Sequence, residues 1–377
     1  MALTTCDFLI VGGGIAGASA AYELAPHGKV IVVERESRPD YHSSGRSSAS
    51  FVETYGDDVV RALNTGSLPF LSSPPNGFTD GPLLTPRGCL HVAREDQLAS
   101  LDRLEATTGR LAGNLRRLDP DQIFELVPIL NPDMIVAAIH EPDCQDLDVN
   151  ALHQGFLRGL KNQNGQLHLA HEVTSLERRG AAWHAGTTDG DFAAPVVVNA
   201  AGAWCDELAD LAGVKPLGMI PLRRTVFTFA PAGDQDCARW PLVLDADENY
   251  YFKPSGGLLL VTPADETPSA PCDAQPEELD VAVAVDRFEN CTRLKVDRIE
   301  YKWAGLRTFS PDKTPVNGMD PDADGFFWLA GQGGYGFQTS SAMARTAAGL
   351  LTGAGVPQDL VDLGVDPDRL SPARFRT

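Results

Sequence analysis

The sequence lacks the features of a membrane, secreted or metal-binding protein. No apolar run approaches the roughly twenty residues that a membrane helix needs. The first apolar run has no basic leader and passes directly into a glycine turn, so we expect no cleaved signal peptide. The seven cysteines never have zinc-finger or CxxC spacing, and an odd number is typical of a reduced compartment. We therefore expect a cytoplasmic protein without structural disulfides or bound metal.

Basic residues are also scarce. The chain has 31 Lys and Arg against 51 Asp and Glu, a formal charge of −20, which argues against nucleic acid or an anionic membrane as a partner. A pocket for an anionic substrate must then be built from a few specific arginines. At 377 residues the chain is long enough for two domains or one large bilobal unit.

The start of the chain has the pattern of a nucleotide-binding βαβ unit. An apolar run, a glycine turn, an Ala-rich helix and a second apolar run fill residues 8–33. Gly12 allows the tight turn, Gly14 lets the backbone approach a pyrophosphate, and Gly17 lets the helix lie close to its strand. The helix N-terminus favours the anion, and the carboxylate of Glu34 can accept both ribose hydroxyls. This motif alone does not distinguish NAD from FAD.

Further segments of the same kind recur later in the chain. Residues 194–206 read as a buried strand, a small-residue turn and a helix, and residues 325–340 as a strand, a glycine turn and a helix beginning near Phe337. Amphipathic helices are expected from about residue 95 to 126. Residues 216–299 alternate like strands, which predicts a curved antiparallel sheet.

Several blocks of sequence carry a family resemblance. They are Tyr-His-Ser-Ser-Gly-Arg-Ser at 41–47, the segment 150–155, Val-Asn-Ala-Ala-Gly-Ala-Trp-Cys-Asp at 198–206, Trp-Ala-Gly-Leu-Arg at 303–307 and Gln-Gly-Gly-Tyr-Gly-Phe-Gln-Thr-Ser at 332–340. In this order they resemble the D-amino-acid oxidase superfamily of FAD-dependent amine and amino-acid oxidoreductases. Within it they are most similar to the bacterial D-arginine dehydrogenases.

The resemblance implies an α/β, bilobal fold in which a Rossmann-like FAD-binding domain is interleaved with an antiparallel-sheet substrate domain. We expect the FAD-binding domain to comprise residues 1–60, 145–215 and 310–377. The substrate-binding domain then comprises residues 61–144 and 216–309.

The resemblance also implies that FAD lies extended across the sheet. Sarcosine-oxidase relatives tether FAD through a cysteine, but the matching stretch 306–315 contains none, so noncovalent FAD is expected. The residues assigned to FAD are Gly12, Gly14, Ile15, Ala16, Gly17, Glu34, Arg35, Ser43, Ser44, Arg46, Ser47, Ser48, Val173, Ala201, Gly202, Trp204, Gly331, Gly333, Gly334, Tyr335, Gly336, Phe337, Gln338 and Thr339.

The resemblance assigns the catalytic pocket to Arg307, Arg224, Tyr55, Tyr251, Gly334 and Gln338. A planar guanidinium makes paired charge-assisted bonds to a carboxylate, which suits Arg307 for holding an amino acid. The resemblance places the carbonyl of Gly334 near the substrate amine. A structural, half-buried role stays open for Tyr55 and Tyr251.

Three residues of the expected side-chain pocket depart from the arginine-specific pattern. Cys89 stands where the arginine enzymes have an acid, Ser50 where they have a histidine, and Val52 where they have a hydroxy side chain. A neutral Cys89 cannot balance a guanidinium, so D-arginine is expected to be a weak substrate and neutral or aromatic substrates better ones. Glu53 is a candidate for the replacement charge, although a backbone direction that hides it is equally compatible with the sequence.

The resemblance further implies amino-acid catabolism by oxidative deamination of a D-amino acid or a related amino compound. Hydride transfer from Cα to flavin N5 gives an imine, which hydrolyses to a 2-oxo acid and ammonia. The electron acceptor, whether O2, a quinone or another molecule, is not determined by the residues. The alternatives are a glycine- or sarcosine-type secondary-amine oxidase, an NAD-dependent dehydrogenase, and a flavin-binding protein without turnover.

Overall fold

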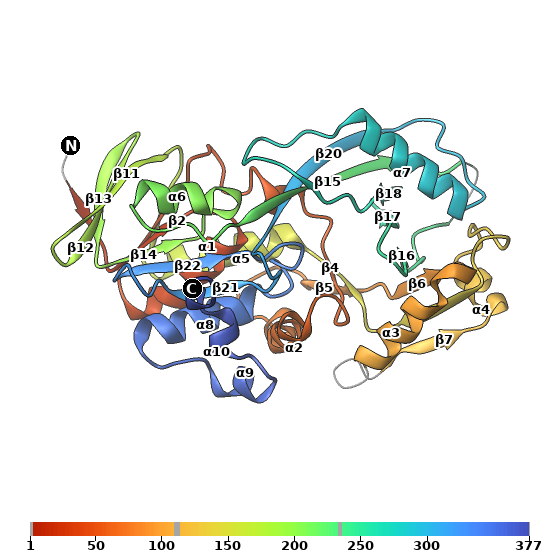
Figure 1. Ribbon diagram of the computed structural model, residues 1–377, viewed down its shortest axis with the longest axis horizontal. Coiled ribbons are helices and arrows are strands. Elements are labelled where there is room, and N and C mark those ends of the chain that lie inside the picture. Colours follow the sequence, from red (N-terminus) through yellow and green to blue (C-terminus); the bar gives the residue numbers. More distant parts are fainter. Residues whose placement is uncertain (1–2, 109–113, 233–235, 377) are drawn as a thin grey trace.

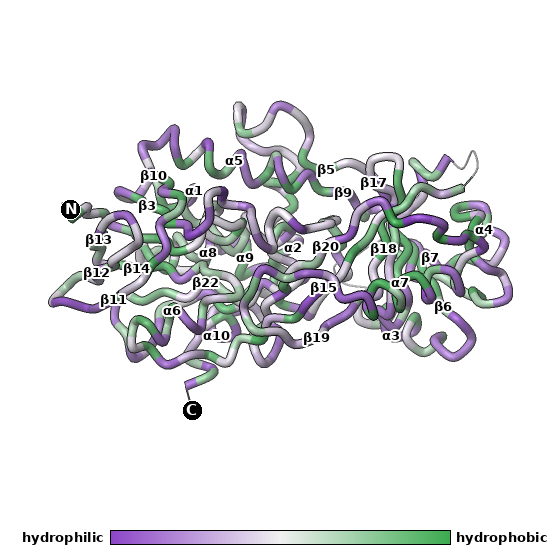
Figure 2. The backbone as a smooth tube through the Cα atoms, turned by 90° about the horizontal axis from the view of Figure 1, so that it is seen from above, coloured by the Kyte–Doolittle hydropathy of each residue, from purple (hydrophilic) through white to green (hydrophobic). Residues whose placement is uncertain are grey.

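The computed structural model describes residues 3–108, 114–232 and 236–376, and its elements form two halves (Figure 1). Both chain termini belong to the half drawn at the left. Strands β15 (Ile220–Phe229) and β20 (Tyr301–Phe309) pair along almost their whole length and reach from the middle into the other half. Hydrophobic stretches run through both halves, and many hydrophilic stretches lie on outer loops (Figure 2).

A six-stranded sheet organises the half that holds the termini. In sheet order its strands are β10 (Gln166–His168), β3 (Val30–Val33), β2 (Phe8–Val11), β14 (Val196–Asn199), β22 (Phe326–Ala330) and β21 (Val316–Met319). The first five are parallel and β21 is antiparallel. The sheet thus unites segments from the beginning, middle and end of the chain, and the predicted α/β fold is confirmed.

Both faces of this sheet are covered, which is why β2, β3 and β22 are apolar throughout and fully buried. One face packs against helices and the other against a small sheet and a short helix. The helices are α1 (Ile15–Leu24), α2 (Asp58–Ser72) and α8 (Ser340–Thr352), with α5 (Val149–Asn162) beside α1; the opposite layer is β1 (Thr4–Thr5), β11 (Val173–Arg179), β12 (Ala182–Thr187), β13 (Gly190–Ala194) and α6 (Cys205–Leu211).

The other half is built on a nine-stranded, mainly antiparallel sheet. Its strands in order are β19 (Thr267–Pro268), β15, β18 (Leu258–Thr262), β17 (Tyr251–Ser255), β16 (Leu242–Asp245), β6 (Cys89–Ala93), β8 (Ala137–Glu141) and β7 (Arg116–Leu118), with β20 paired to β15. The pairing of β16 with β6 is parallel. Helices α3 (Leu98–Thr108) and α4 (Pro120–Leu126) pack on β8, and α7 (Glu278–Cys291) packs on β15 and β18.

The helix α7 corrects the expectation that residues 216–299 are all strand-like. Its buried residues Val281, Ala284, Phe288 and Cys291 are three or four positions apart, which is the spacing of one helix face. Phe288 packs edge-on against Phe229 and Phe252 of the sheet. Burial of this face therefore selects the helix over the alternating pattern of its neighbours.

Two further element boundaries differ from expectation. Helix α8 begins at Ser340 and not near Phe337, because residues 333–339 form consecutive turns, with Tyr335 N–H donating to the carbonyl of Gln332. The helical span expected from 95 to 126 is interrupted by strand β7, and residues 109–113 within it lie outside the described residues.

The two halves are also connected by a three-stranded sheet of β4 (Ser50–Phe51), β9 (Gln145–Leu147) and β5 (Leu84–Pro86). Helix α2 begins just before the predicted boundary at residue 60 and packs against α8 and α9 (Gln358–Asp362). The domain division stays a prediction, and these contacts favour moving that boundary beyond α2.

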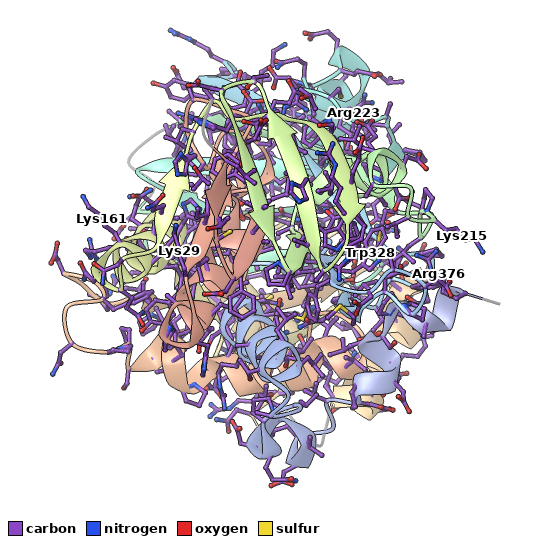
Figure 3. All side chains as sticks on the ribbon, turned by 90° about the vertical axis from the view of Figure 1, so that its left-hand side faces the viewer. Lys29, Lys161, Lys215, Arg223, Trp328 and Arg376 are labelled. Carbon is purple, nitrogen blue, oxygen red and sulfur yellow. The ribbon has the colours of Figure 1, made fainter. Side chains whose placement is uncertain are left out.

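The end of the chain is anchored on the six-stranded sheet. The indole of Trp328 donates to Oδ2 of Asp320 at 2.9 Å, and Arg376 binds the same buried oxygen. Trp328 and Arg376 accordingly lie close together in Figure 3. Helix α10 (Pro367–Leu370) also packs on β21 next to this cluster.

Candidate active site

Three cavities follow one another along the junction of the two halves. Their volumes are about 350, 150 and 140 Å³. The 350 and 150 Å³ cavities share Gly14, Ser43, Ser44, Ala200 and Gly202, and the 150 and 140 Å³ cavities share Ser47, Ser48, Arg224, Tyr251, Arg307 and Gly334. We call them the first, second and third cavity in this order. The shared walls make the three cavities one path, and the third cavity is the small pocket at its end.

The first cavity lies at the carboxyl ends of β2, β3 and β14, where open α/β sheets bind nucleotides. Gly12 has a φ of +108°, and a Cβ there would stand 2.4 Å from the carbonyl oxygen of Ala200. A Cβ on Gly17 would stand 1.9 Å from the carbonyl oxygen of Gly12, so α1 lies directly against the turn. Helix α1 begins after Gly14 without an acidic residue in its first turn, which leaves its positive end free for a phosphate.

The acid at the end of β3 is held in place by backbone amides. Glu34 Oε2 accepts from Gly13 N–H at 2.7 Å, and Oε1 accepts from Glu36 N–H at 2.9 Å. Burial raises the pKa of Glu34, while the two amide hydrogen bonds favour the charged form. The carboxylate lines the first cavity and keeps lone pairs for ribose hydroxyls.

Aromatic and basic side chains close the adenosine side of the first cavity. The Arg35 guanidinium lies 4.9 Å from the ring centre of Trp204 and pairs with Glu172 at 3.6 Å. The His42 ring lies 4.5 Å from Trp204 on the same side. A planar base can stack against such a surface.

The second cavity is lined by the glycine turn before α8 and by the start of α1. Two buried amide nitrogens have no hydrogen-bond partner within the described residues, Nε2 of Gln332 beside this cavity and Nε2 of Gln338 beside the third. Unpaired buried donors are rare in proteins and indicate a missing acceptor. Their position beside a nucleotide-sized path fits the polar edge of a flavin.

Arg46 lines the second cavity and binds backbone carbonyls beside it. Its Nη1 donates to the carbonyls of Ala274 at 2.8 Å and Ala304 at 3.0 Å, and its Nη2 pairs with Asp273. Ser44 Oγ accepts from Ile15 N–H at 2.9 Å and so fixes this segment on the start of α1.

The third cavity contains a cation without an acidic partner. Arg307 Nη1 donates to Tyr55 Oη at 3.3 Å, and Nη2 donates to Tyr251 Oη at 3.4 Å. Tyr251 Oη also lies 3.0 Å from Ser48 Oγ. Within the described chain, no carboxylate lies within 4.0 Å of the Arg307 guanidinium. The pocket therefore has positive charge and hydroxyl groups available for an anionic ligand.

Strand register brings a second arginine to the same face. Arg307 on β20 pairs with Leu222 on β15, so Arg224, two residues along, projects on the same side of the ladder. Arg224 is partly neutralised, since Nε donates to Asp265 O at 2.8 Å and Nη2 lies 3.5 Å from Glu266. Burial, and then the charge of Arg307, lower the pKa of Arg224.

The protonation states of this cluster are set by burial and by the arginines. Burial opposes the charge of Arg307, but the phenols of Tyr55 and Tyr251 outweigh it and raise its pKa. Burial raises the pKa of Tyr55. For Tyr251, burial acts in the same direction, but Arg307 and Arg224 reverse its effect and lower the pKa. Tyr251 is therefore the phenol that ionises first.

Most of the predicted site residues line the three cavities. They are Gly12, Gly14, Glu34, Arg35, Ser43, Ser44, Val173, Ala201, Gly202 and Trp204 in the first; Ile15, Ala16, Arg46, Ser47, Gly333, Gly336 and Phe337 in the second; and Ser48, Ser50, Val52, Tyr55, Arg224, Tyr251, Arg307, Gly334 and Gln338 in the third.

Five predicted residues do not line any of the three cavities. Gly17 and Gly331 shape the backbone next to the path, and Thr339 is buried with Oγ1 donating to Tyr335 O. Tyr335 packs its ring edge-on against Tyr55, with 5.2 Å between ring centres. Cys89 is fully buried among Val52, Cys144 and Leu242. We therefore correct the expectation that Cys89 faces the substrate.

Several lining residues were not predicted from the sequence. They are Tyr41, His42, His171 and Glu172 in the first cavity, Gln332 in the second, and Thr54, His91, Leu104, Leu242, Leu244, Asp245 and Glu248 in the third. The sequence contained a signal for His91, because it lies two residues after Cys89, and alternate residues of a strand share one face. The leucines come from strands and a helix far apart in sequence and gave no such signal.

Other site types find no support in the described residues. Within residues 3–108, 114–232 and 236–376, no group of three or more His, Cys, Asp or Glu could hold a metal ion. All seven cysteines are free thiols. In the same ranges, no helix has the length and apolar character required to cross a bilayer.

Comparisons with known proteins agree with this geometry. The chain is 24% identical over 386 residues to mitochondrial dimethylglycine dehydrogenase from Rattus norvegicus, covering 96% of this chain and 44% of that protein. It thus spans less than half the length of this relative. These similarities do not place the chain with the D-arginine dehydrogenases in particular.

Two solved structures share the fold. The L-proline dehydrogenase from P. horikoshii superposes with a TM-score of 0.86 at 19% identity, covering 100% of this chain and 99% of that one. The glycine oxidase from Geobacillus kaustophilus gives 0.84 at 20% identity, covering 98% and 99%. Residues 7–350 match the DAO family model, described as FAD dependent oxidoreductase, so the chain belongs to this family and the prediction of FAD as its cofactor is confirmed.

Proposed function

We propose that the protein oxidises the C–N bond of a small amino acid whose carboxylate binds Arg307. The observation that carries this proposal is the arginine itself, which has no ion-pair partner in the described chain and faces a small cavity at the end of the FAD path. A buried, unpaired cation is costly unless a ligand anion completes it. A carboxylate between Arg307 and the hydroxyls of Tyr55 and Tyr251 would supply that anion.

The residues of the pocket position the substrate. The Arg307 fork can hold two carboxylate oxygens in one plane, and the Tyr55 and Tyr251 hydroxyls can donate to the same oxygens. Gly334 lies against this cluster, since a Cβ there would be 3.0 Å from Tyr55 Oη and 3.1 Å from Arg307 Nη1. A substrate held at this point lies beside the second cavity, where Gly334 is also part of the wall. Such fixed placement accounts for much of the rate in a reaction that needs little acid–base chemistry.

FAD, when bound, accepts the hydride that leaves the substrate carbon. Loss of that hydride from carbon and of a proton from nitrogen leaves an imine, and water converts the imine into a 2-oxo acid and ammonia. The substrate must present a neutral amine to the cofactor. We leave the electron acceptor undefined among O2, a quinone and other molecules.

We propose D-amino acids with neutral side chains as the first substrate class. Leu104, Leu242 and Leu244 line the cavity beyond Arg307 and suit an apolar tail. D-Arginine remains a weak candidate. Asp245, the buried acid in this wall, already accepts from Gln97 and Asn249 and is not available for a guanidinium.

N-alkylated glycines are the second candidate class. The relatives named dimethylglycine dehydrogenase and glycine oxidase favour it. The volume of about 140 Å³ is also compatible with a small substrate.

Anaerobic bleaching of the flavin band near ~450 nm tests both classes. The purified protein is mixed separately with D- and L-amino acids, sarcosine, dimethylglycine and proline. Bleaching by D-amino acids supports the first class, and bleaching by the N-methylglycines supports the second. A yellow protein that no amino compound bleaches contradicts the proposal. Reoxidation by air, or only by a dye, separates an oxidase from a dehydrogenase.

We expect FAD to be released intact when the protein is denatured by acid. No cysteine lines any of the three cavities in the described chain. The measurement is the absorbance of supernatant and pellet after acid precipitation. A yellow supernatant supports noncovalent binding, and a yellow pellet contradicts it.

Catalytic efficiency is expected to fall in alkaline solution as Tyr251 ionises. Because the arginines lower the pKa of Tyr251 below its ordinary value of 10.0, its phenolate forms at a lower pH and competes with the substrate carboxylate for Arg307. The contribution of neutral Tyr251 to kcat/KM should therefore be fully present at neutral pH and should be lost as pH rises through this pKa. Deprotonation of the substrate amine acts in the opposite direction, since the neutral amine is the reactive form.

The substitution Tyr251→Phe should remove this alkaline decline. Tyr55→Phe is the matched control, because burial raises the pKa of Tyr55 and keeps its phenol neutral in the same range. The pH profiles of kcat/KM for the three proteins are compared. An unchanged decline in Tyr251→Phe would show that another group titrates.

A further inference from the structure

The wall of the third cavity contains an imidazole that the proposed chemistry does not use. His91 lies on β6, is 5% exposed and lines the cavity together with Leu104, Leu242 and Leu244. A polar ring at this place is costly to bury unless its nitrogens have partners.

One ring nitrogen is held by a buried carboxylate. His91 Nε2 lies 3.4 Å from Oε2 of Glu141, which is 2% exposed. Glu141 is fixed in turn by three donors, namely Thr54 Oγ1 at 2.6 Å, Glu53 N–H at 3.0 Å and Thr54 N–H at 3.4 Å. Burial opposes the charge, but the hydrogen bonds from His91 and Thr54 lower the pKa of Glu141 and keep it a carboxylate.

This arrangement determines which nitrogen carries the proton. A carboxylate only accepts, so His91 Nε2 must donate to Glu141. Cys89 Sγ, 3.5 Å from the same nitrogen, does not change this, because a thiol is a much weaker hydrogen-bonding partner than a carboxylate and its sulfur can accept from the same N–H. Nδ1 has no hydrogen-bond partner among the described residues, and in the neutral ring it is an acceptor.

The other polar groups of this wall are already engaged or lie apart. Asp245 accepts from Gln97 and Asn249, and Thr54 Oγ1 donates to Glu141. Glu248 is exposed, on the turn between β16 and β17. His91 is therefore the buried group of this wall with a free hydrogen-bonding position.

We propose that His91, oriented by Glu141, selects substrates whose uncharged side chain ends in a hydrogen-bond donor. The substrate class is an amino acid such as tyrosine, tryptophan or asparagine, in preference to phenylalanine or leucine of similar shape. The leucines contact the body of the side chain, and Nδ1 of His91 accepts from its terminal O–H or N–H. This inference rests on the proposed function, since it assumes that the amino acid's carboxylate occupies Arg307.

The test compares kcat/KM for two pairs in which only one member has a terminal donor, tyrosine against phenylalanine and asparagine against leucine, in the stereochemical series that bleaches the flavin. The wild type should prefer the member with the donor. In His91→Leu, which fills similar space without an acceptor, this preference should fall about tenfold, the effect of one lost hydrogen bond. His91→Asn places an oxygen near the position of Nδ1 and should retain part of the preference. If the role of His91 were merely structural, His91→Leu would lower kcat/KM equally for both members of each pair.

The outcomes separate this inference from the proposed function. If no amino compound bleaches the wild-type flavin, both are wrong. If amino acids bleach it but the paired ratios are the same in wild type and His91→Leu, only the role of His91 is wrong. Retained FAD and an unchanged thermal unfolding transition show that the variant is folded. Should His91→Leu fail this criterion, His91→Met replaces it as an acceptor-free side chain of flexible shape, and the same ratios decide.

Discussion

Replacement of Arg307 by methionine is expected to lower kcat/KM for the amino-acid substrate by about 10²- to 10³-fold, the loss typical when a buried charge pair loses one partner. The physical reason is the position of Arg307 between Tyr55 and Tyr251, where it has no ion-pair partner among the described residues. Most of the loss should be seen as a raised KM, because the carboxylate is bound in both the ground state and the transition state.

Arg307→Lys distinguishes charge from geometry. Lysine keeps the positive charge but is a point charge that cannot make two parallel bonds. We expect a loss of activity intermediate between those of the wild type and Arg307→Met. Equal losses in the two variants would indicate that the fork, and not the charge, holds the carboxylate.

Arg223 offers a matched control on the same strand. It is adjacent to Arg224, so its side chain projects from the opposite face, where it pairs with Asp280 at 3.0 Å and with Glu277. Arg223→Met should leave kcat/KM close to that of the wild type. If Arg223→Met and Arg307→Met lost activity to the same extent, the assignment of the carboxylate site to Arg307 would be wrong.

Stability should change far less than activity. Removal of Arg307 relieves the repulsion that contributes to the lowered pKa of Arg224, but it also removes the hydrogen bonds to Tyr55 and Tyr251. We therefore expect the unfolding temperature of substrate-free Arg307→Met to lie close to that of the wild type. This measurement separates loss of binding from loss of folding.

Local patterns predicted the FAD half of the molecule well because its signals are short-range. The strand, turn and helix around Gly12, Gly14 and Gly17 follow from residues that are neighbours in sequence. The strand Val196–Asn199 was predicted for the same reason, because it is a short apolar run that precedes small residues.

The pocket depended on contacts that no local pattern contains. The register of β15 and β20 brings Arg224 and Arg307 to one face, although they are 83 positions apart. Only the family resemblance named both residues. Cys89 and His91 show a limit of reasoning from sequence. Alternation along a strand puts both side chains on one face, but it does not tell which of them reaches the cavity. The longer imidazole does, and the thiol is covered by Val52 and Cys144.

The substitution Gly17→Ala is expected to destabilise the protein and weaken FAD binding strongly. Alanine is the better helix residue by roughly 0.5–1 kcal/mol, so local propensity alone predicts a gain in stability. The added Cβ, however, would stand 1.9 Å from the carbonyl oxygen of Gly12 and 3.2 Å from Ile10 Cγ2. The carbonyl belongs to the backbone of the turn and cannot rotate away, so α1 must move off β2.

That movement acts on the cofactor because the start of α1 forms part of the first and second cavities. Gly14 and Ile15 line these cavities, and Ile15 N–H is bonded to Ser44 Oγ. We expect the free energy of unfolding of the FAD-free protein to fall by about 1–3 kcal/mol, the usual cost of overpacking. We expect FAD affinity to fall by about tenfold or more, since each 1.4 kcal/mol of lost binding energy is a factor of ten. Urea unfolding of FAD-free protein and FAD titration followed by flavin fluorescence measure the two effects.

Gly81→Ala is the control for the glycine-to-alanine change itself. A Cβ on Gly81 meets no atom within 4 Å, so the substitution adds a methyl group without a contact. It should leave FAD affinity unchanged, and its stability should be equal to or slightly above that of the wild type. If Gly17→Ala behaved like Gly81→Ala, the close contact of α1 with its turn would not be what holds the helix N-terminus at the pyrophosphate. If Gly17→Ala bound FAD weakly and Gly81→Ala did not, FAD affinity would depend on the absence of a Cβ at position 17. That Cβ would stand 1.9 Å from the backbone carbonyl oxygen of Gly12.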